Sequence, residues 1–213
     1  MKERNSGSVP EFLFDPNIKE LQKKREFREA RLTESESCYR KMNDFIQGGN
    51  MTEVWNAYDL NRNQLPHLLI RGEKIPEGQF HLCVNVLVRH EDGDILFMRR
   101  SANKSFYPGY YEFGAGGSVL AGEDSQTAAL RELEEETGLV PDSIRLLEQV
   151  CSVEDQCHFD FYEAVVSGDK SQVRYQAGET DAHVWLPLRE IPAFSESHPC
   201  FQNQKKILQR WIG

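Results

Sequence analysis

The segment 125–137 constrains the fold most, because it predicts a helix whose two sides have opposite chemistry. Its apolar residues, spaced for one side, are Ala129, Leu130 and Leu133. Its acidic residues, at helical spacing on the other side, are Glu132, Glu135 and Glu136. Gly138 follows where a left-handed C-terminal cap is expected. The apolar side has to pack on another layer of the protein, which leaves three carboxylates together on the opposite side.

Strand-like runs surround this helix. They cover residues 53–58, 67–70, 80–89, 94–100, 110–113, 144–153, 158–166 and 183–186. Alternation within 80–89 indicates a mostly buried strand with a single polar side, and Asp92-Gly93 predicts a hairpin turn after it. A Gly-rich segment, 114–123, leads into the central helix, and a second helix is expected at 203–212. Many strands with one central and one terminal helix predict an α/β fold with a mixed sheet between helices.

The first part of the chain has a different composition. Residues 1–48 are dense in charge and in good helix formers, and they end at Gly48 and Gly49. We therefore expect an N-terminal helical extension at 1–48 and a main domain at 49–213. Apolar residues in the extension are too few for a core of its own. We expect it to dock, across a homodimer rather than on the same subunit.

The overall composition excludes several classes of protein. With 34 acidic and 25 basic side chains, the net charge is −9, which argues against binding to a nucleic-acid backbone. No apolar run approaches the roughly 20 residues of a membrane span, so we expect no membrane contact and a cytoplasmic location. The five cysteines form no CxxC pair, so we expect reduced thiols, with neither a disulfide framework nor a structural zinc site.

The three helical carboxylates predict a metal site. Like charges at this spacing repel, and each pair costs an isolated helix about 0.2–0.5 kcal/mol. A divalent cation between them would remove that penalty. Mg²⁺ suits carboxylate oxygens and commonly shares its coordination shell with substrate phosphates, and Mn²⁺ is an alternative.

The residues around the helix resemble the signature of the Nudix hydrolases. The matching pattern is Gly117-x5-Glu123-x7-Arg131-Glu132-Leu133-x-Glu135-Glu136-x-Gly138-Leu139. The resemblance implies a Nudix α/β/α sandwich with a mixed sheet between helices. It also implies a pyrophosphohydrolase that cleaves a diphosphate in a small molecule, a nucleoside diphosphate linked to another group.

The same resemblance implies roles for single residues. The implied metal ligands are Glu132, Glu135, Glu136 and the carbonyl group of Gly116. Arg131 is similar to an arginine that holds a motif glutamate in position, and Glu123 has a supporting role. Some Nudix enzymes also use an acidic residue from a late loop. Glu179 is the candidate here, and Glu154 and Glu163 are alternatives.

Upstream of the motif, residues 99–117 look like the branch that includes isopentenyl-diphosphate isomerase. In that enzyme, cations spaced like Arg100 and Lys104 bind the substrate's diphosphate, which suits an anion clamp. The isomerase's cysteine would align with Gly116, and one of its metal-binding histidines with Ser118, so both groups are absent here. His81 matches another such histidine, but we expect a strand histidine satisfied by its neighbours.

Three functions remain open on this basis. The leading hypothesis is a Mg²⁺-dependent hydrolase of nucleoside-diphosphate derivatives. A second is a regulatory module that binds a nucleotide without turnover, which has less need of three metal carboxylates. The third, isomerisation at carbon, is disfavoured by Gly116 and Ser118.

Overall fold

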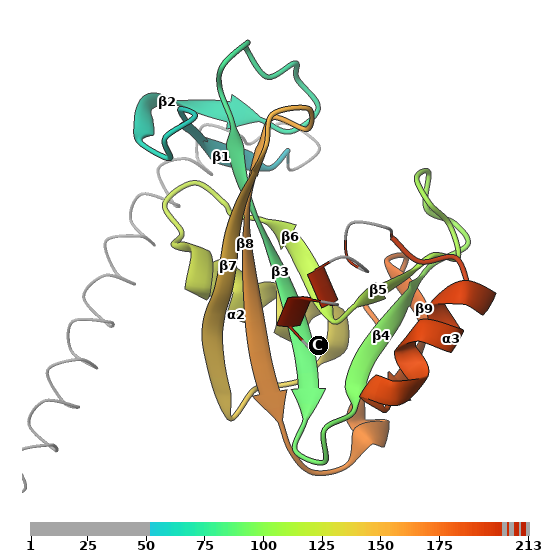
Figure 1. Ribbon diagram of the computed structural model, residues 1–213. Coiled ribbons are helices and arrows are strands. Elements are labelled where there is room, and N and C mark those ends of the chain that lie inside the picture. The colour runs from blue at the N-terminus through green and yellow to red at the C-terminus, as the bar shows by residue number, and fades with distance from the viewer. Residues whose placement is uncertain (1–51, 202–203, 205–206, 209, 212–213) are drawn as a thin grey trace, which may run out of the picture. The chain divides into compact units, whose positions relative to one another are not determined.

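A computed structural model describes residues 52–201 together with 204, 207, 208, 210 and 211 (Figure 1). The predicted extension at 1–48 lies outside the described residues. Residues from Thr52 onward form a compact unit with its own hydrophobic clusters. Within the described residues, no helix is long and apolar enough to cross a membrane.

Strands dominate the described chain. They are β1 (Val54–Tyr58), β2 (Gln64–Ile70), β3 (His81–His90), β4 (Ile95–Arg100), β5 (Tyr111–Phe113), β6 (Ala115–Ser118), β7 (Ser143–Ser152), β8 (Cys157–Val166) and β9 (Thr180–Leu186). The helices are α2 (Ser125–Thr137), α3 (Ile191–Ser197) and the 3-10 turns η1 (Lys170–Gln172) and η2 (Leu188–Glu190). Residues 204, 207, 208, 210 and 211 are helical as well, in agreement with the predicted terminal helix.

The main sheet is mixed. Its order is β5-β4-β3-β8-β7, with β6 paired to β3 and β9 paired to β4. The β3–β8 pair at its centre is parallel, and the other pairs are antiparallel. The strand β3 meets β4 only at Arg89↔Ile95 and pairs with β6 from Cys83 to Val86. The neighbour of β3 therefore changes along its length: β4 lies beside Arg89, and the Gly-rich β6 lies beside Cys83–Val86.

Helices cover both faces of this sheet. Val84, Val86 and Val88 of β3 point to the face on which α2 packs, and Leu133 of α2 is fully buried among them. Leu87 points to the other face. That second cluster also includes residues of α3 and of the terminal helix, namely Ile191, Phe194, Ile207, Leu208 and Trp211. The predicted arrangement of a mixed sheet between helices is confirmed.

The helix α2 begins and ends where the sequence indicates. The Asp124 side chain accepts a hydrogen bond from the Thr127 amide at 2.8 Å, which caps the first turn. Gly138 has φ +68°, and its N–H donates to the Glu134 carbonyl group at 2.8 Å. The buried side of the helix is slightly rotated from the predicted one, because Ala128 is buried while Leu130 is half-buried.

A small antiparallel hairpin, β1–β2, forms a second sheet. Trp55, Ala57 and Leu69 form its core. Arg62 in the turn forms an ion pair with Asp160 of β8. Asp160 is buried and also accepts a hydrogen bond from the Ser125 hydroxyl group at 2.5 Å. The hairpin turn is thereby connected to both the main sheet and the start of α2.

One strand of the structure, β6, is not predicted from the sequence. Residues Ala115–Ser118 form β6, although glycine disfavours strands and the sequence AGGS gives no strand pattern. Pairing with β3 stabilises this conformation, with Asn85 opposite Gly116 and Val84 opposite Gly117. The strand matters for function because it lies beside the acidic side of α2.

Candidate functional site

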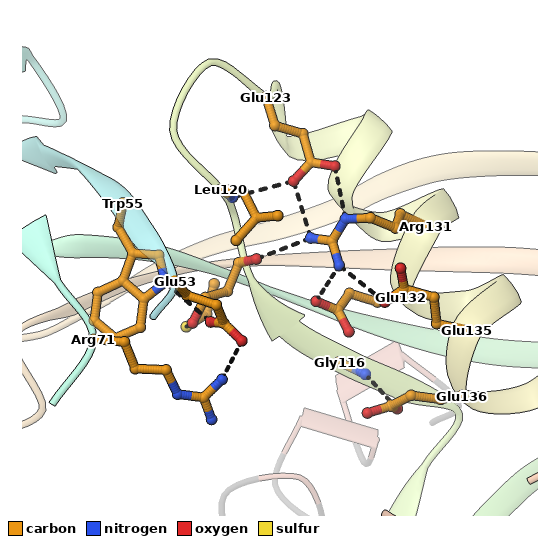
Figure 2. A network of polar contacts seen from close by, with 12 residues as sticks. Glu53, Trp55, Arg71, Gly116, Leu120, Glu123, Arg131, Glu132, Glu135 and Glu136 are labelled. Carbon is orange, nitrogen blue, oxygen red and sulfur yellow. Dashed lines mark hydrogen bonds and ion pairs between the residues drawn. The ribbon is translucent and has the colours of Figure 1, made fainter. Parts of the chain in front are cut away.

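The carboxylates of α2 lie against β6 (Figure 2). The amide of Gly116 donates a hydrogen bond to Glu136 at 3.1 Å. Gly117 faces Glu132 so closely that an added Cβ would overlap the Glu132 carboxylate. Glycine at 117 is therefore required for this approach, and not for an unusual backbone conformation, because its φ is not positive.

Arg131 is the centre of the polar network in Figure 2. Its guanidinium binds Glu123 through two contacts of 2.9 Å, in a bidentate arrangement. It also donates to Glu132 at 2.8 Å, to Glu135 at 3.2 Å and to the Ser118 carbonyl group at 3.1 Å. Glu123 in turn accepts from the Leu120 amide at 3.1 Å. Arg131 thus joins the helix, β6 and the loop between them.

Two of the helical carboxylates have raised pKa values. Burial raises the pKa of Glu132, and Arg131 partly offsets this effect. Burial, followed by repulsion from Glu112 and Glu132, raises the pKa of Glu136 well above its usual value. For Arg131, burial opposes the charged form, but Glu123 and Glu132 outweigh it and raise the pKa. Glu136 is thus the carboxylate with the strongest need for a neighbouring cation.

A second group of charged residues comes from the ends of β4, β5 and β9. Arg100, at the end of β4, forms an ion pair with Glu112 of β5 at 3.0 Å. Lys104, in the following loop, forms an ion pair with Glu179, directly before β9. These residues meet because β4 pairs with β5 on one side and β9 on the other.

The two groups lie near each other. Charge repulsion from both Glu112 and Glu179 contributes to the raised pKa of Glu136. Burial also raises the pKa of Glu112 itself, although Arg100 opposes this. The structure thus brings the predicted cations Arg100 and Lys104 and the predicted base Glu179 to the same region as Glu136.

Sequence reasoning missed Glu112 and Glu53. Glu112 has no motif around it, and its place becomes clear only from the pairing of β4 with β5. Glu53 forms an ion pair with Arg71, and its charge also adds to the raised pKa of Glu132. The only sequence signal for either residue is an acidic side chain beside an apolar strand.

The alternatives to Glu179 have different surroundings. Glu163 is buried and binds Arg89 at 2.8 Å and Arg145 at 2.6 Å. Its carboxylate is therefore already paired with two arginines. Glu154 is exposed in the turn between β7 and β8.

Two features of the acidic site suit a divalent cation. Glu136 is a carboxylate of raised pKa that accepts a hydrogen bond from one backbone amide, and Gly117 leaves room for Glu132 beside the strand. Carboxylate oxygens are the ligands that Mg²⁺ prefers. Arg131 already binds Glu132 and Glu135, so a metal ion would share these two carboxylates with the guanidinium.

Comparison with known proteins places this geometry in a family. Residues 79–210 match the family model of the NUDIX domain. The Nudix hydrolase lmo0368 of Listeria monocytogenes is 40% identical over 90 residues, which are 42% of this chain and 53% of that protein. The matched segment thus spans about half the length of that relative. An RNA pyrophosphohydrolase of Roseobacter denitrificans is 30% identical over 141 residues, which are 66% of this chain and 81% of that protein.

Solved structures share the fold. The crystal structure of DR0079 from Deinococcus radiodurans has a TM-score of 0.62 at 19% identity, and the match covers 74% of this chain and 98% of that one. The NUDIX domain model covers more than half of the chain and includes the residues of the site, from Arg100 to Glu179. The chain therefore belongs to the Nudix hydrolase family.

Proposed function

We propose that this protein hydrolyses a diphosphate bond in a nucleoside diphosphate linked to another group, with Mg²⁺ as cofactor. The observation that carries the proposal is that Glu136, a buried carboxylate in need of a cation, lies near Glu112 and Glu179, which form ion pairs with Arg100 and Lys104. A metal ion and two basic side chains together would neutralise the charge of a diphosphate. Without them, the acidic residues of the site would repel it.

The metal ligands in this proposal are Glu132, Glu135, Glu136 and the carbonyl group of Gly116. Bound Mg²⁺ would polarise a phosphoryl oxygen and lower the pKa of a coordinated water molecule. Arg131 is a positioning residue, because it donates one hydrogen bond each to Glu132 and Glu135 while two more anchor it to Glu123. Mn²⁺ is expected to replace Mg²⁺ with similar ligands.

Arg100 and Lys104 retain donors for substrate although both have acidic partners. An ammonium group has three N–H bonds, so Lys104 can bind Glu179 and a phosphate oxygen at the same time. The guanidinium of Arg100 donates through Nη1 to Glu112 and through Nε to the Phe106 carbonyl group at 3.4 Å. Its Nη2 remains available to a second phosphate oxygen in this arrangement.

Glu179 is the proposed proton acceptor for the attacking water. Its charge is near enough to Glu136 to contribute to the raised pKa of that residue, which supports this role. Lys104 holds that carboxylate in place. The rate contribution expected from a positioned general base is about 10²–10⁴-fold.

The test is product analysis of the full chain with Mg²⁺ and a panel of substrates. The panel contains ADP-ribose, nucleotide sugars, dinucleoside polyphosphates and isoprenoid diphosphates, and the Glu136→Gln variant is the control. Release of a nucleoside monophosphate by the parent protein, and not by the variant, supports the proposal. Binding without turnover across the panel would instead support the regulatory alternative.

The isoprenoid diphosphates in the panel test the third hypothesis, isomerisation at carbon. Isomerisation in deuterated water would place deuterium on carbon, whereas hydrolysis in ¹⁸O-labelled water places the label on phosphorus. The likeness of residues 99–117 to the isomerase branch stays a prediction until this comparison is made. A homodimer also stays a prediction.

A further inference from the structure

A second cluster of metal-ligating side chains lies at the start of the central strand pair. His81 and Cys83 come from β3, and Cys157 comes from β8. One ligand atom from each, the two Sγ atoms and a ring nitrogen, lie within 4.8 Å of one another. Among the residues that the structure describes, no other group of three histidine, cysteine or acidic side chains converges in this way.

Strand register explains the convergence. In the parallel pair, His81 lies opposite Cys157. Cys83 follows two residues later on β3, so its side chain points to the same face as His81. On the other side of β3, Ser118 of β6 lies opposite Cys83, with its Oγ 3.8 Å from the Cys83 Sγ. Three adjacent strands therefore supply side chains to one small patch of the sheet.

This patch is separate from the acidic site of α2. Residues of β3 that face α2 have even numbers, such as Val84 and Val86, whereas His81 and Cys83 belong to the opposite face. The same alternation holds in β6, where Gly117 faces Glu132 and Ser118 faces Cys83. The two sites therefore lie back to back across β6.

One pair of these ligand atoms has the spacing expected around a tetrahedral metal ion. Typical bonds of about 2.3 Å to sulfur and about 2.0–2.1 Å to nitrogen, at the tetrahedral angle, separate the two ligand atoms by about 3.6 Å. The distance from Cys83 Sγ to His81 Nδ1 is 3.6 Å. A water molecule or the Ser118 hydroxyl group would complete the coordination.

The surroundings also suit a metal. The indole of Trp55 stacks on the His81 ring with centroids 4.4 Å apart, which fixes the orientation of the imidazole. The His81 amide donates to the Gln156 carbonyl group at 3.1 Å and so holds the start of β3 beside Cys157. His81 and Cys83 are half-buried, which leaves a path from solvent, whereas Cys157 is buried.

The two thiols lie close enough to affect each other. The Cys157 thiol and the His81 ring both lower the pKa of Cys83. Cys83 and burial together raise the pKa of Cys157. Metal binding would release thiol protons to solvent.

We propose that His81, Cys83 and Cys157 form a Zn²⁺ site that links β3 to β8, distinct from the Mg²⁺ site of α2. Thiolate and imidazole ligands select zinc over magnesium, because Mg²⁺ prefers oxygen ligands and an octahedral shell. Sequence spacing does not reveal this site, because the histidine and the two cysteines come from strands that are far apart in the chain.

The test is a cobalt titration of the full, tag-free chain, kept reduced with a phosphine. Co²⁺ replaces Zn²⁺ in tetrahedral sites and gives a near-ultraviolet band when it binds thiolate, which carboxylate sites do not produce. We expect one Co²⁺ per chain with this band, unaffected by excess Mg²⁺ and displaced by Zn²⁺. A reduced parent protein without the band would overturn the proposal, whatever the variants do.

Variants assign the ligands. Cys83→Ser and Cys157→Ser each remove one thiolate, so the intensity of the band should fall to about half or less. The affinity for Zn²⁺ should fall at least about tenfold. Cys151→Ser, an exposed cysteine of β7, is the matched control and should retain both. An unchanged band in either Cys83→Ser or Cys157→Ser would refute the assignment.

Two further measurements separate this site from the proposed hydrolase site. Glu136→Gln should retain the cobalt band, because Glu136 lies on the other face of the sheet. Zn²⁺ should raise the melting temperature of the parent protein and of Cys151→Ser, but not that of Cys157→Ser. Loss of the band in Glu136→Gln would contradict the independence of the two sites.

Discussion

The ammonium group of Lys104 forms an ion pair with the carboxylate of Glu179, although the two residues lie on loops at the ends of different strands. One is the proposed phosphate-binding cation and the other the proposed general base. We therefore expect the pair to couple substrate binding to proton transfer. A substrate phosphate that draws Lys104 toward itself would also change the position of Glu179.

Single and double variants of this pair should separate the two roles. Lys104→Ala removes one charge-assisted contact, which is worth about 1.5–3 kcal/mol and corresponds to roughly a 10- to 150-fold rise in KM. Glu179→Gln should instead lower kcat by about 10²-fold or more. Steady-state kinetics of both variants and of the double variant measures the coupling. Identical effects of the two single variants would contradict separate roles, and an unchanged KM and kcat/KM in Lys104→Ala would make Lys104 a surface charge.

Glu136→Gln should be more stable than the parent protein but less active. The amide removes a buried charge that has no cation in the metal-free protein, so the variant should be more stable by about 0.5–2 kcal/mol in EDTA. Turnover should fall at least about 10²-fold, the lower end for a lost catalytic carboxylate. Denaturant unfolding and product assays measure the two effects. Full activity of the parent protein in excess EDTA would contradict the metal requirement itself.

The stability of the metal-free protein should depend on pH through Glu136. Its pKa is raised in the folded state, so the folded chain binds this proton more tightly than the unfolded chain, whose glutamates have a pKa of about 4.3. The free energy of unfolding should therefore fall as pH rises from that value through the raised pKa. Saturating Mg²⁺ binds the ionised form and should oppose this fall.

The measurement is the melting temperature between about pH 5 and 8, in EDTA and in Mg²⁺. Other groups titrate in the same range, so the informative quantity is the difference between the parent protein and Glu136→Gln. A difference that does not change with pH in EDTA would contradict the prediction.

Gly117→Ala should affect the metal site more than the fold. The three heavy atoms nearest to the added Cβ all belong to the flexible end of the Glu132 side chain, and the backbone of residue 117 needs no positive φ. We expect the free energy of unfolding to change by less than about 1 kcal/mol, while half-saturation by Mg²⁺ requires about tenfold more metal. Metal-dependent turnover measures this effect. In a Glu132→Gln background the same substitution should add little, because the displaced carboxylate is already lost.

Removal of the N-terminal segment tests its predicted role. We propose that the chain starting at Met51 keeps its fold, its metal site and at least part of its activity, because the residues from Thr52 onward contain their own hydrophobic clusters. It should lose stability or dimerisation. Light scattering measures the molar mass of the truncated chain, and product assays measure its activity. A truncated chain with unaltered stability, molar mass and activity would show that the segment is a passive tail.

The sequence predicts α2 well because its determinants are local. The Asp124 cap, the Gly138 cap and the spacing of the three glutamates all lie within one short segment. The strand β6 is not predictable in this way, since its residues include two glycines and its conformation depends on pairing with β3. Local patterns therefore identify the helix but not the strand against which its carboxylates lie.

The same limit applies to the site. Arg131 and the helical glutamates are recognisable from one motif, whereas Glu112 carries no local signal. Its position beside Arg100 depends on the pairing of β4 with β5, and that pairing is set by burial of Phe97 and Phe113 on the face covered by α3. Contacts of this kind are determined by packing across the whole sheet.

The parallel pairing of β3 with β8 also has a consequence for the order in which the protein folds. Every element of the acidic site from β4 to α2 lies in the chain between these two strands, and Tyr162 and Ala164 of β8 help to cover the apolar side of α2. Strand pairs distant in sequence form slowly, because a long loop must be closed before any contact is gained. During synthesis, α2 is therefore made well before the strand that covers it. The rate at which activity appears on refolding should follow the rate at which β8 inserts beside β3.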